Sequence, residues 1–448
     1  MKANPPKEFG PSSSHHQVNG GLDSPPSVGS WTNQRIGEVV IRTQHRNPET
    51  NPEKRFTYID VSAVSNTLFR VTAPAELLGS EAPSRARKVV NAGDVLFATV
   101  RPTLKRVALV PRHLHDQIAS TGYIVLRAAP GILDPGYLYF RLLTDEFIAR
   151  MRELERGASY PAVRDSDVLN EVIPVPTLPE QQKIAGVVGM VQRALVQQDS
   201  LLQAAAELKK SILHKLFTVG LRGEPQKQTE IGPVPMSWEE RALEEAGDVV
   251  YGIQAAVAAN LQPIGTKILT NKNITLDGRV VTDTINYFVL KTKRHHQTAL
   301  RKGDLLFNWR SGSKEHVGKT AYFDLDGEYT HSSFILRIRP HDEVTGRYLF
   351  YYLNFLRESG HFLKSQTFSV NAKFNKSAIN RLPTYLPRDE ERKAIVAALD
   401  AVAKKIEMLE RKRLLLTDLF RTLLHRLMTA QIRVNHLDLT ELESAVGA

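Results

Sequence analysis

The chain of 448 residues carries 59 Lys and Arg against 48 Asp and Glu, a formal net charge of +11, and contains no cysteine. The missing cysteine excludes disulfides, thiolate zinc sites and cysteine nucleophiles, and no apolar run approaches the ~20 residues of a membrane-spanning helix. The length predicts two domains, and the basic balance favours a polyanionic partner, although many basic proteins bind no polyanion.

Residues 1–30 are rich in Pro, Ser, Gly and His and have no apolar centre. This composition predicts a disordered tail and not a signal peptide, which is compatible with a cytoplasmic protein. Residues 31–177 alternate short β-branched and aromatic runs with turn-forming residues. Within them 123–127 is predicted as a strand and 137–147 as a helix, so a mixed α/β domain is expected.

Residues 178–222 change character, because they are rich in Ala, Leu, Gln, Glu and Lys and contain no proline after Pro179. A proline in the first turn followed by Glu180 is typical of a helix start. The alternative is an ordinary core helix, but the apolar residues recur at alternating spacings of three and four, which predicts a coiled-coil seam. The seam residues are Ile184, Val188, Val191, Leu195 and Leu202.

Residues 223–235 are rich in Gly and Pro and are predicted as a linker. A second mixed domain over 236–387 follows, with a strand expected at 334–338 and a helix at 348–362. A second seam-bearing helix is predicted over 388–433, before a tail of residues 434–448. Its seam residues are Ile395, Leu399, Val402, Ile406 and Leu409.

The two halves of the chain repeat one another. Leu213–Arg222 is matched by Leu424–Arg433, a shift of 211 residues (213 to 424), and Gly93–Phe97 is matched by Gly303–Phe307. A nearly constant shift is typical of a duplicated unit. The predicted fold is therefore mixed α/β (α+β), with two duplicated domains, two long antiparallel coiled-coil helices and an internal pseudo-twofold axis. Each helix of about 38 residues would be roughly 57 Å long.

Basic loops follow the Gly-Asp-x-Leu-Phe strand at matched places in both halves. Such a loop is usually only solvated, but its recurrence favours contact with phosphates and base edges of DNA. The candidates are Arg101, Lys105 and Arg106 in the first half, and Asn308, Arg310, Lys314 and Lys319 in the second. A further matched pair of loops, 160–164 and 371–376, adds Arg164, Asn371 and Lys373. Phosphate contacts and a plain charged face are equally compatible with Arg85, Arg87 and Lys88.

Three kinds of short segment resemble enzyme motifs. Residues 312–320 look like a phosphate-binding loop, but the spacing of the glycines is one residue too long and Ser313 occupies a required glycine position. Residues 4–7 (Asn-Pro-Pro-Lys) lack the aromatic ring of an adenine-methyltransferase motif. The histidine pairs at 15–16 and 295–296 have no carboxylate at metal-ligand spacing. No catalytic residue and no metal site is therefore predicted.

Several stretches, in this order, resemble the specificity subunit of type I restriction–modification systems. They are residues 83–102 around the Gly-Asp-x-Leu-Phe motif, 178–184 (Leu-Pro-Glu-Gln-Gln-Lys-Ile) and 232–235 leading to Trp238. The resemblance covers about residues 31 to 433. It identifies residues 31–177 and 236–387 as two target-recognition domains, and residues 178–222 and 388–433 as two spacer helices.

The resemblance implies a non-catalytic reader of double-stranded DNA. Each recognition domain would read one half of a split target, and the different loops in the two domains predict an asymmetric target. Two modification (methyltransferase) subunits and restriction motor–nuclease subunits would be its partners, and no membrane would be involved. No cofactor is expected in this chain, whereas S-adenosylmethionine, ATP and Mg are expected on the partner subunits. The rival hypotheses are a nuclease or methyltransferase acting alone and a coiled-coil protein with no DNA role.

Overall fold

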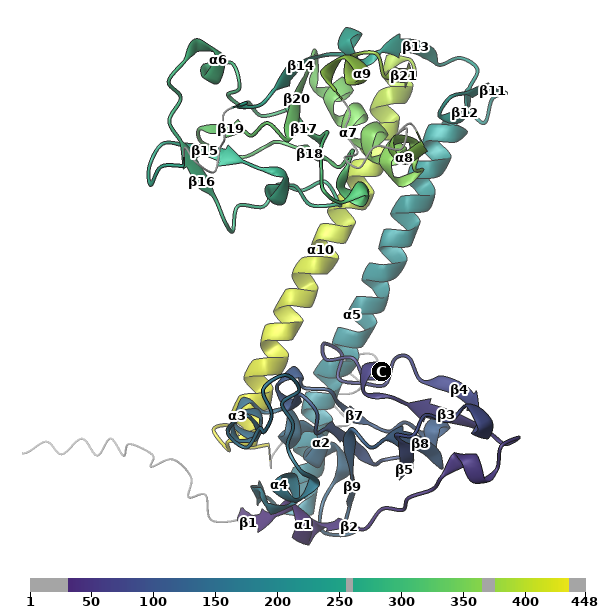
Figure 1. Ribbon diagram of the computed structural model, residues 1–448, viewed down its shortest axis with the longest axis vertical. Helices are drawn as coiled ribbons and strands as arrows, with labels where there is room; N and C mark the ends of the chain where they lie inside the picture. Colours follow the sequence, from purple (N-terminus) through teal and green to yellow (C-terminus); the bar gives the residue numbers. More distant parts are fainter. Residues whose placement is uncertain (1–30, 255–260, 365–374, 435–448) are drawn as a thin grey trace, which may run out of the picture. The chain divides into compact units, whose positions relative to one another are not determined.

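The computed structural model describes residues 31–254, 261–364 and 375–434. The chain divides into two compact units, one of residues 1–196 with 415–448 and the other of residues 197–414. Each unit holds one mixed α/β domain together with parts of two long helices (Figure 1).

The first unit is built on two four-stranded sheets and one two-stranded sheet. Its strands are β1 (Thr32–Arg35), β2 (Val40–Ile41), β3 (Arg55–Ile59), β4 (Ala75–Leu78), β5 (Ala86–Val90), β6 (Val95–Ala98), β7 (Val107–Leu109), β8 (Gln117–Ser120), β9 (Tyr123–Ala128) and β10 (Val172–Val175). The sheet orders are β2-β9-β6-β7, β4-β3-β8-β5 and β1-β10. Within the middle sheet, β3 and β8 are parallel.

The helices of the first unit are α1 (Ile36–Val39), α2 (Pro135–Leu143), α3 (Asp145–Glu153), α4 (Asp165–Asn170) and the first part of α5 (Leu178–Thr218), together with the end of α10 (Asp389–Met428). The single helix predicted over 137–147 is wrong. The chain breaks at Thr144, whose hydroxyl accepts a hydrogen bond from the Phe147 amide at 3.3 Å and so caps a new helix.

The second unit repeats this topology. Its strands are β11 (Gln226–Thr229), β12 (Gly232–Pro235), β13 (Glu239–Ala242), β14 (Gly247–Tyr251), β15 (Thr266–Leu269), β16 (Asn286–Phe288), β17 (Leu305–Asn308), β18 (Thr320–Tyr322), β19 (Tyr329–His331), β20 (Ile335–Pro340) and β21 (Pro383–Leu386). The order β14-β20-β17-β18 matches β2-β9-β6-β7, β15 and β19 are parallel like β3 and β8, and β13-β21 matches β1-β10. The duplication predicted from the sequence is therefore confirmed.

The helices of the second unit are α6 (Lys293–His296), α7 (Glu343–Glu358), α8 (His361–Lys364), α9 (Lys376–Asn380) and most of α10 (Asp389–Met428). The helix expected over 348–362 is divided into α7 and α8. The segment 223–235, expected as a linker, contains the antiparallel hairpin of β11 and β12. Helix α5 ends before residue 222 because Gly220 takes a left-handed conformation, with φ of +70°. A Cβ at this glycine would lie 2.9 Å from Pro235.

Within each unit the two long helices pack antiparallel. In the first unit, Ile184 and Val188 of α5 are buried in one core with Phe420, Leu424 and Leu427 near the end of α10, and Val191 and Leu195 are partly buried there. In the second unit, Leu213, Leu216 and Phe217 near the end of α5 share a core with Ile395 and Leu399 near the start of α10. The start of each helix thus lies against the end of the other. Among the described residues, no helix combines the length and apolar character needed to cross a bilayer.

A polar residue of α5 also contacts the other long helix. Gln198 is 2% exposed, and its amide Nε2 donates a hydrogen bond of 2.8 Å to the backbone oxygen of Leu409 on α10. The remaining seam residues Leu202, Val402, Ile406 and Leu409 are only partly buried. A buried polar side chain that finds its partner in only one alignment favours a single register of the two helices.

The Gly-Asp-x-Leu-Phe motif has a structural role in both units. Asp94 is 1% exposed, accepts from the Asn91 amide at 2.7 Å, and forms two hydrogen bonds of 2.7 Å with Arg127 on β9. Asp304 repeats this geometry with the Arg301 amide and with Arg339 on β20. Each arginine's pKa is raised, chiefly by the hydrogen bond to its aspartate. The motif therefore ties the turn before β6 or β17 to the neighbouring strand.

A second duplicated contact joins the start of each long helix to the segment that follows the other. In the first unit, the buried carboxylate of Glu180 accepts from Arg433 Nε at 2.7 Å and from Trp31 Nε1 at 3.2 Å. In the second, buried Glu391 accepts from the Leu221 amide at 3.1 Å and lies 3.8 Å from Arg222 Nε. This glutamate clasp explains why the repeated stretches 213–222 and 424–433 both end in arginine.

A buried histidine makes the stability of the second unit depend on pH. His331 on β19 is fully buried, with Nδ1 3.1 Å from the Thr298 oxygen, and desolvation lowers its pKa to about 4. Because the unfolded chain binds the proton at higher pH than the folded chain, stability falls as pH drops from about 6.5 towards 4. We expect the non-titrating variant His331→Asn to show a flatter pH dependence of its urea midpoint in that window. Equal slopes for both proteins would contradict this assignment.

Candidate nucleic-acid interface

Two loops predicted separately from the sequence come together at one face of the first unit. The Arg101 amide donates to the Pro161 oxygen at 2.7 Å, and the Val163 amide donates to the Thr99 oxygen at 2.9 Å. These bonds hold the loop after β6 against the segment 156–164. Arg101 and Lys105 both adopt left-handed backbone conformations, with φ of +50° and +53°, at either end of a short 3-10 turn. The loop is therefore tightly folded.

Arg101 lies on an exposed aromatic ring in this face. Its guanidinium carbon is 4.8 Å from the ring centroid of Tyr160, a side chain that is 72% exposed. One guanidinium nitrogen, Nη2, donates to the Ser159 oxygen at 3.3 Å. Arg164 is exposed at the start of α4, on the same segment. The structure thus brings Arg101, Tyr160 and Arg164 onto two adjoining loops.

The corresponding loop of the second unit carries a similar pair. Trp309 is fixed by a hydrogen bond from Nε1 to the Ser333 oxygen at 2.7 Å. The guanidinium carbon of Arg310 lies 5.4 Å from the ring centroid of Phe334, which is 38% exposed. Among the described residues, the Arg310 side chain has no hydrogen bond or ion pair. Lys314 is exposed on the same loop.

Two of the predicted DNA contacts instead hold the fold together. Arg106 donates from Nη1 to the oxygens of Val61, Ser62 and Val64, around the 3-10 turn that follows β3. Lys319 is 4% exposed and donates to the oxygens of Asn271 and Ile274, each at 2.6 Å, around the matching turn after β15. Burial lowers the pKa of Lys319 to about 8. Both predicted DNA contacts thus have an internal role in the fold, although Arg106 stays partly exposed whereas Lys319 is buried.

Asn308, predicted as a base contact, is fully buried in this structure, and its Nδ2 donates to the His316 oxygen at 2.7 Å. Lys105 is partly buried, with its ammonium 2.5 Å from Asp145, so a phosphate would compete with that carboxylate. Asn371 and Lys373 lie outside the described residues.

The other charged candidates also include one buried residue and one exposed residue. Lys88 is 7% exposed and lies 2.7 Å from Asp165, so it belongs to the interior of the unit and not to a phosphate-binding face. Arg85 is exposed.

The segment 312–320, which resembles a phosphate-binding loop in sequence, is covered by packing at its second glycine. The backbone of Gly318 lies so near Phe362 that a Cβ there would be 2.2 Å from its ring, and Lys319 points into the protein. The backbone at Gly318 and Lys319 is therefore not open to a phosphate. Within the described ranges, no group of three or more His, Asp or Glu side chains is placed to hold a metal ion.

Sequence reasoning missed a basic cluster beside the second loop. Arg294 and His295 of α6 and Lys376 of α9 line a pocket of about 260 Å³ together with Tyr251. Tyr251 contacts the Trp309 ring edge-on and accepts a hydrogen bond from the Lys376 amide at 2.8 Å, which joins this pocket to the Arg310 loop. The sequence feature that indicates this cluster is the basic run 291–296, of which only the two histidines were interpreted above, as a possible metal site.

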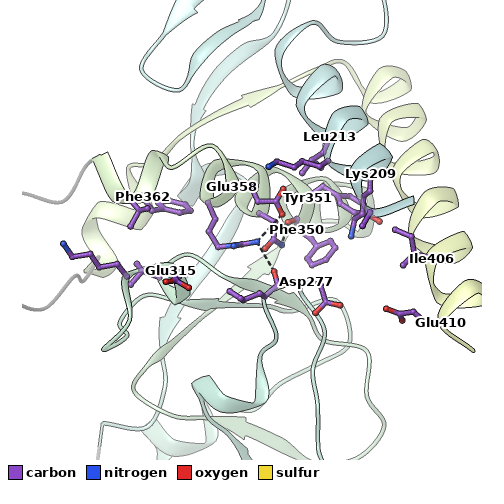
Figure 2. Close-up of a pocket in the computed structure, with 18 residues that line it drawn as sticks. Lys209, Leu213, Asp277, Glu315, Phe350, Tyr351, Glu358, Phe362, Ile406 and Glu410 are labelled. Carbon is purple, nitrogen blue, oxygen red and sulfur yellow. Dashed lines mark hydrogen bonds and ion pairs between the residues drawn. The ribbon is translucent and has the colours of Figure 1, made fainter. Parts of the chain in front are cut away.

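A larger cavity of about 610 Å³ lies between α7 and the paired helices of the second unit (Figure 2). Arg357 spans it, donating to the Leu276 oxygen at 2.9 Å and pairing with Glu358. The lining contains four basic and four acidic side chains, so it favours neither an anionic nor a cationic ligand. These are Lys209, Lys210, Lys314 and Arg357, and Asp277, Glu315, Glu358 and Glu410.

Comparison with known proteins relates both halves of the chain to one family. A family model described as the type I restriction modification DNA specificity domain matches residues 29–199 and again residues 235–417. The type I restriction enzyme MjaVIII specificity subunit of Methanocaldococcus jannaschii is 23% identical over 356 residues, covering 78% of this chain and 81% of that protein.

Solved structures give the same relation. A chain from work on complex assembly and conformational transition of the type I restriction–modification system is 29% identical, with a TM-score of 0.57, and the match covers 89% of this chain and 98% of that one. The S subunit of a type I system from M. genitalium has the same fold, with a TM-score of 0.56 at 14% identity, over 92% of this chain and 98% of that chain.

Proposed function

Because the chain belongs to the family of type I restriction–modification DNA specificity proteins, we propose that its two duplicated domains read the two halves of a split, asymmetric DNA target. It is the sequence-specific DNA-recognition subunit of a type I restriction–modification complex and is not itself an enzyme. The observation that carries this conclusion is the match of the family model to both halves of the chain.

The matched positions of the exposed basic side chains support the reading of DNA by both domains. Arg101 in the first domain, and Arg310 and Lys314 in the second, lie on loops that follow the equivalent strands β6 and β17, and Arg164 lies on the adjoining segment before α4. The loops themselves differ, since Thr99–Pro102 in the first domain corresponds to Asn308–Ser311 in the second. Different loops present different donors to the base edges, which supports two unlike half-sites and hence an asymmetric target.

The duplication also supports two modification subunits for each chain, because a pseudo-twofold scaffold offers two similar docking surfaces. Restriction motor–nuclease subunits would join this complex. The cofactors S-adenosylmethionine, ATP and Mg would be held by those partners, since the chemistry of methyl transfer and of translocation would be theirs. The paired helices would set the length of the unread gap between the half-sites.

The proposed function is tested by mapping N6-methyladenine across the host genome with this gene intact and deleted. Loss of one split, asymmetric methylated motif on deletion would support it. If no motif changes, DNA binding by the purified chain is measured against salt concentration. Phosphate contacts weaken steeply with salt, so salt-insensitive binding or no binding would reject a DNA-reading role.

Exposed leucines on the long helices suggest where partner subunits dock. Leu414 of α10 is 67% exposed and Leu208 of α5 is 55% exposed, although both are large apolar side chains on otherwise charged helices. We expect Leu414→Glu to weaken assembly with the modification subunit by about tenfold or more, since it places a charge in an apolar contact. Pull-down titration measures this, with Lys412→Glu as a control at an exposed charged position of the same helix. Equal affinity for both variants would place docking elsewhere.

A further inference from the structure

The two units repeat one local arrangement, although the residues that form it differ. In each, an arginine in the loop after the Gly-Asp-x-Leu-Phe strand lies over an exposed aromatic ring from another segment. Arg101 lies over Tyr160 at 4.8 Å, and Arg310 lies over Phe334 at 5.4 Å. The rings are 72% and 38% exposed, so neither ring is part of a core.

An aromatic ring under a guanidinium restricts the orientation of that group. A free surface arginine samples many rotamers, and fixing one of them on binding costs entropy. A cation–π contact with the ring favours a limited set of guanidinium positions, and in the first unit the bond from Arg101 Nη2 to the Ser159 oxygen restricts the group further. The arginine therefore has less freedom to lose when it binds a base edge.

We propose that Arg101 and Arg310 each read the guanine of a G·C pair through the major groove, with Tyr160 and Phe334 as positioning residues. This inference rests on the proposed function, because it assumes that these loops meet DNA. The two parallel N–H groups of an oriented arginine match the O6 and N7 acceptors of guanine, and other bases do not offer that pair of acceptors. Each half-site should then contain at least one G·C pair that is read by a single side chain.

A phosphate contact is the alternative, and the geometry argues against it. A guanidinium can also bind a phosphate in a bidentate way, but a charge without a ring is enough for that contact, as at Arg164 and Lys314, where no aromatic ring lies over the charge among the described residues. An exposed ring beneath the arginine in both units adds a restricted orientation, which the reading of one base edge requires. The two kinds of contact also differ in their consequences, since loss of a phosphate contact weakens binding to all sequences uniformly.

The test is selection of bound sequences from a randomised duplex library by the full chain in complex with its modification subunits. The wild type should select a motif with a G·C pair in each half. Arg101→Ala should reduce discrimination at one such pair by roughly ten- to one-hundredfold and leave the other half-site unchanged, and Arg310→Ala should do the reverse. Arg101→Lys should lose the same discrimination while keeping affinity for non-target DNA, because lysine retains the charge but not the fork.

Two further measurements separate reading from general weakening. Replacing the assigned guanine by 7-deazaguanine removes N7, so it should weaken wild-type binding by about tenfold and leave Arg101→Ala unaffected. Tyr160→Leu should lower discrimination by roughly two- to fivefold, whereas Tyr160→Phe should retain it. An unchanged motif with uniformly lower affinity for Arg101→Ala and Arg310→Ala would overturn the inference and leave the proposed function standing. Failure of the wild-type complex to select any motif would overturn both.

Discussion

Replacing Asp304 by asparagine is expected to lower the free energy of unfolding of the second unit by about 3–5 kcal/mol. The carboxylate is 1% exposed and is hydrogen-bonded to both Nε and Nη2 of Arg339. The amide would place its NH₂ group against the guanidinium and leave this partly buried charge without its counterion. Urea denaturation of the full chain, followed by a probe of the second unit, measures the change.

Two controls in the same chain sharpen this measurement. Asp94→Asn should destabilise the first unit by a similar amount, because it breaks the duplicated pair with Arg127. Asp326→Asn removes an ion pair with Lys302 at the surface, where the Asp326 side chain is 92% exposed and the Lys302 side chain 59% exposed. This change should lower the free energy of unfolding by less than about 1 kcal/mol. If Asp304→Asn were no more destabilising than Asp326→Asn, the motif would have no structural role.

The second large effect is expected at the glutamate clasp, where the two copies should respond unequally. Glu180→Gln should cost about 3 kcal/mol, because it removes a buried charge that contacts both Arg433 at 2.7 Å and Trp31. Glu391→Gln should cost only about 1 kcal/mol. Its arginine partner, Arg222, is 3.8 Å away and 52% exposed, and the amide oxygen of glutamine can still accept from Leu221.

A double-mutant cycle of Glu180→Gln with Arg433→Met isolates the pair itself. Hydrogen exchange of the last turns of α10 would locate the effect at the helix end. A coupling energy near zero, or equal losses for Glu180→Gln and Glu391→Gln, would show that the clasp does not stabilise the first unit in the way the geometry indicates.

The repeated architecture could be predicted from the sequence because it depends on regular spacings between residues. The matched stretches 213–222 and 424–433, and the two Gly-Asp-x-Leu-Phe motifs, recur at nearly constant shifts, and apolar residues at three- and four-residue intervals predict paired long helices. Individual side-chain interactions, such as helix caps, were harder to predict from the sequence. The break at Thr144 depends on one side-chain cap within an otherwise helical apolar pattern.

The roles of the basic residues could not be read from spacing. Arg101, Arg106 and Lys319 all lie on the loops between equivalent strands, β6–β7 or β17–β18. Arg101 nevertheless reaches solvent over Tyr160, while Arg106 and Lys319 turn inward to backbone carbonyls. Those carbonyls belong to residues more than 40 positions earlier in the chain, brought close by the sheet. The sequence alone does not distinguish a basic residue that lies near a backbone acceptor from one that faces solvent.

The sequence by itself therefore determined the duplication and the helix pairing, because both follow from periodic patterns along one chain, and it indicated the family through the resemblance of its motifs. Only the tertiary structure decided which basic side chains are exposed and which satisfy buried polar groups. The physical reason is that a buried carbonyl or carboxylate must find a partner, and the fold alone determines which basic side chain lies within reach.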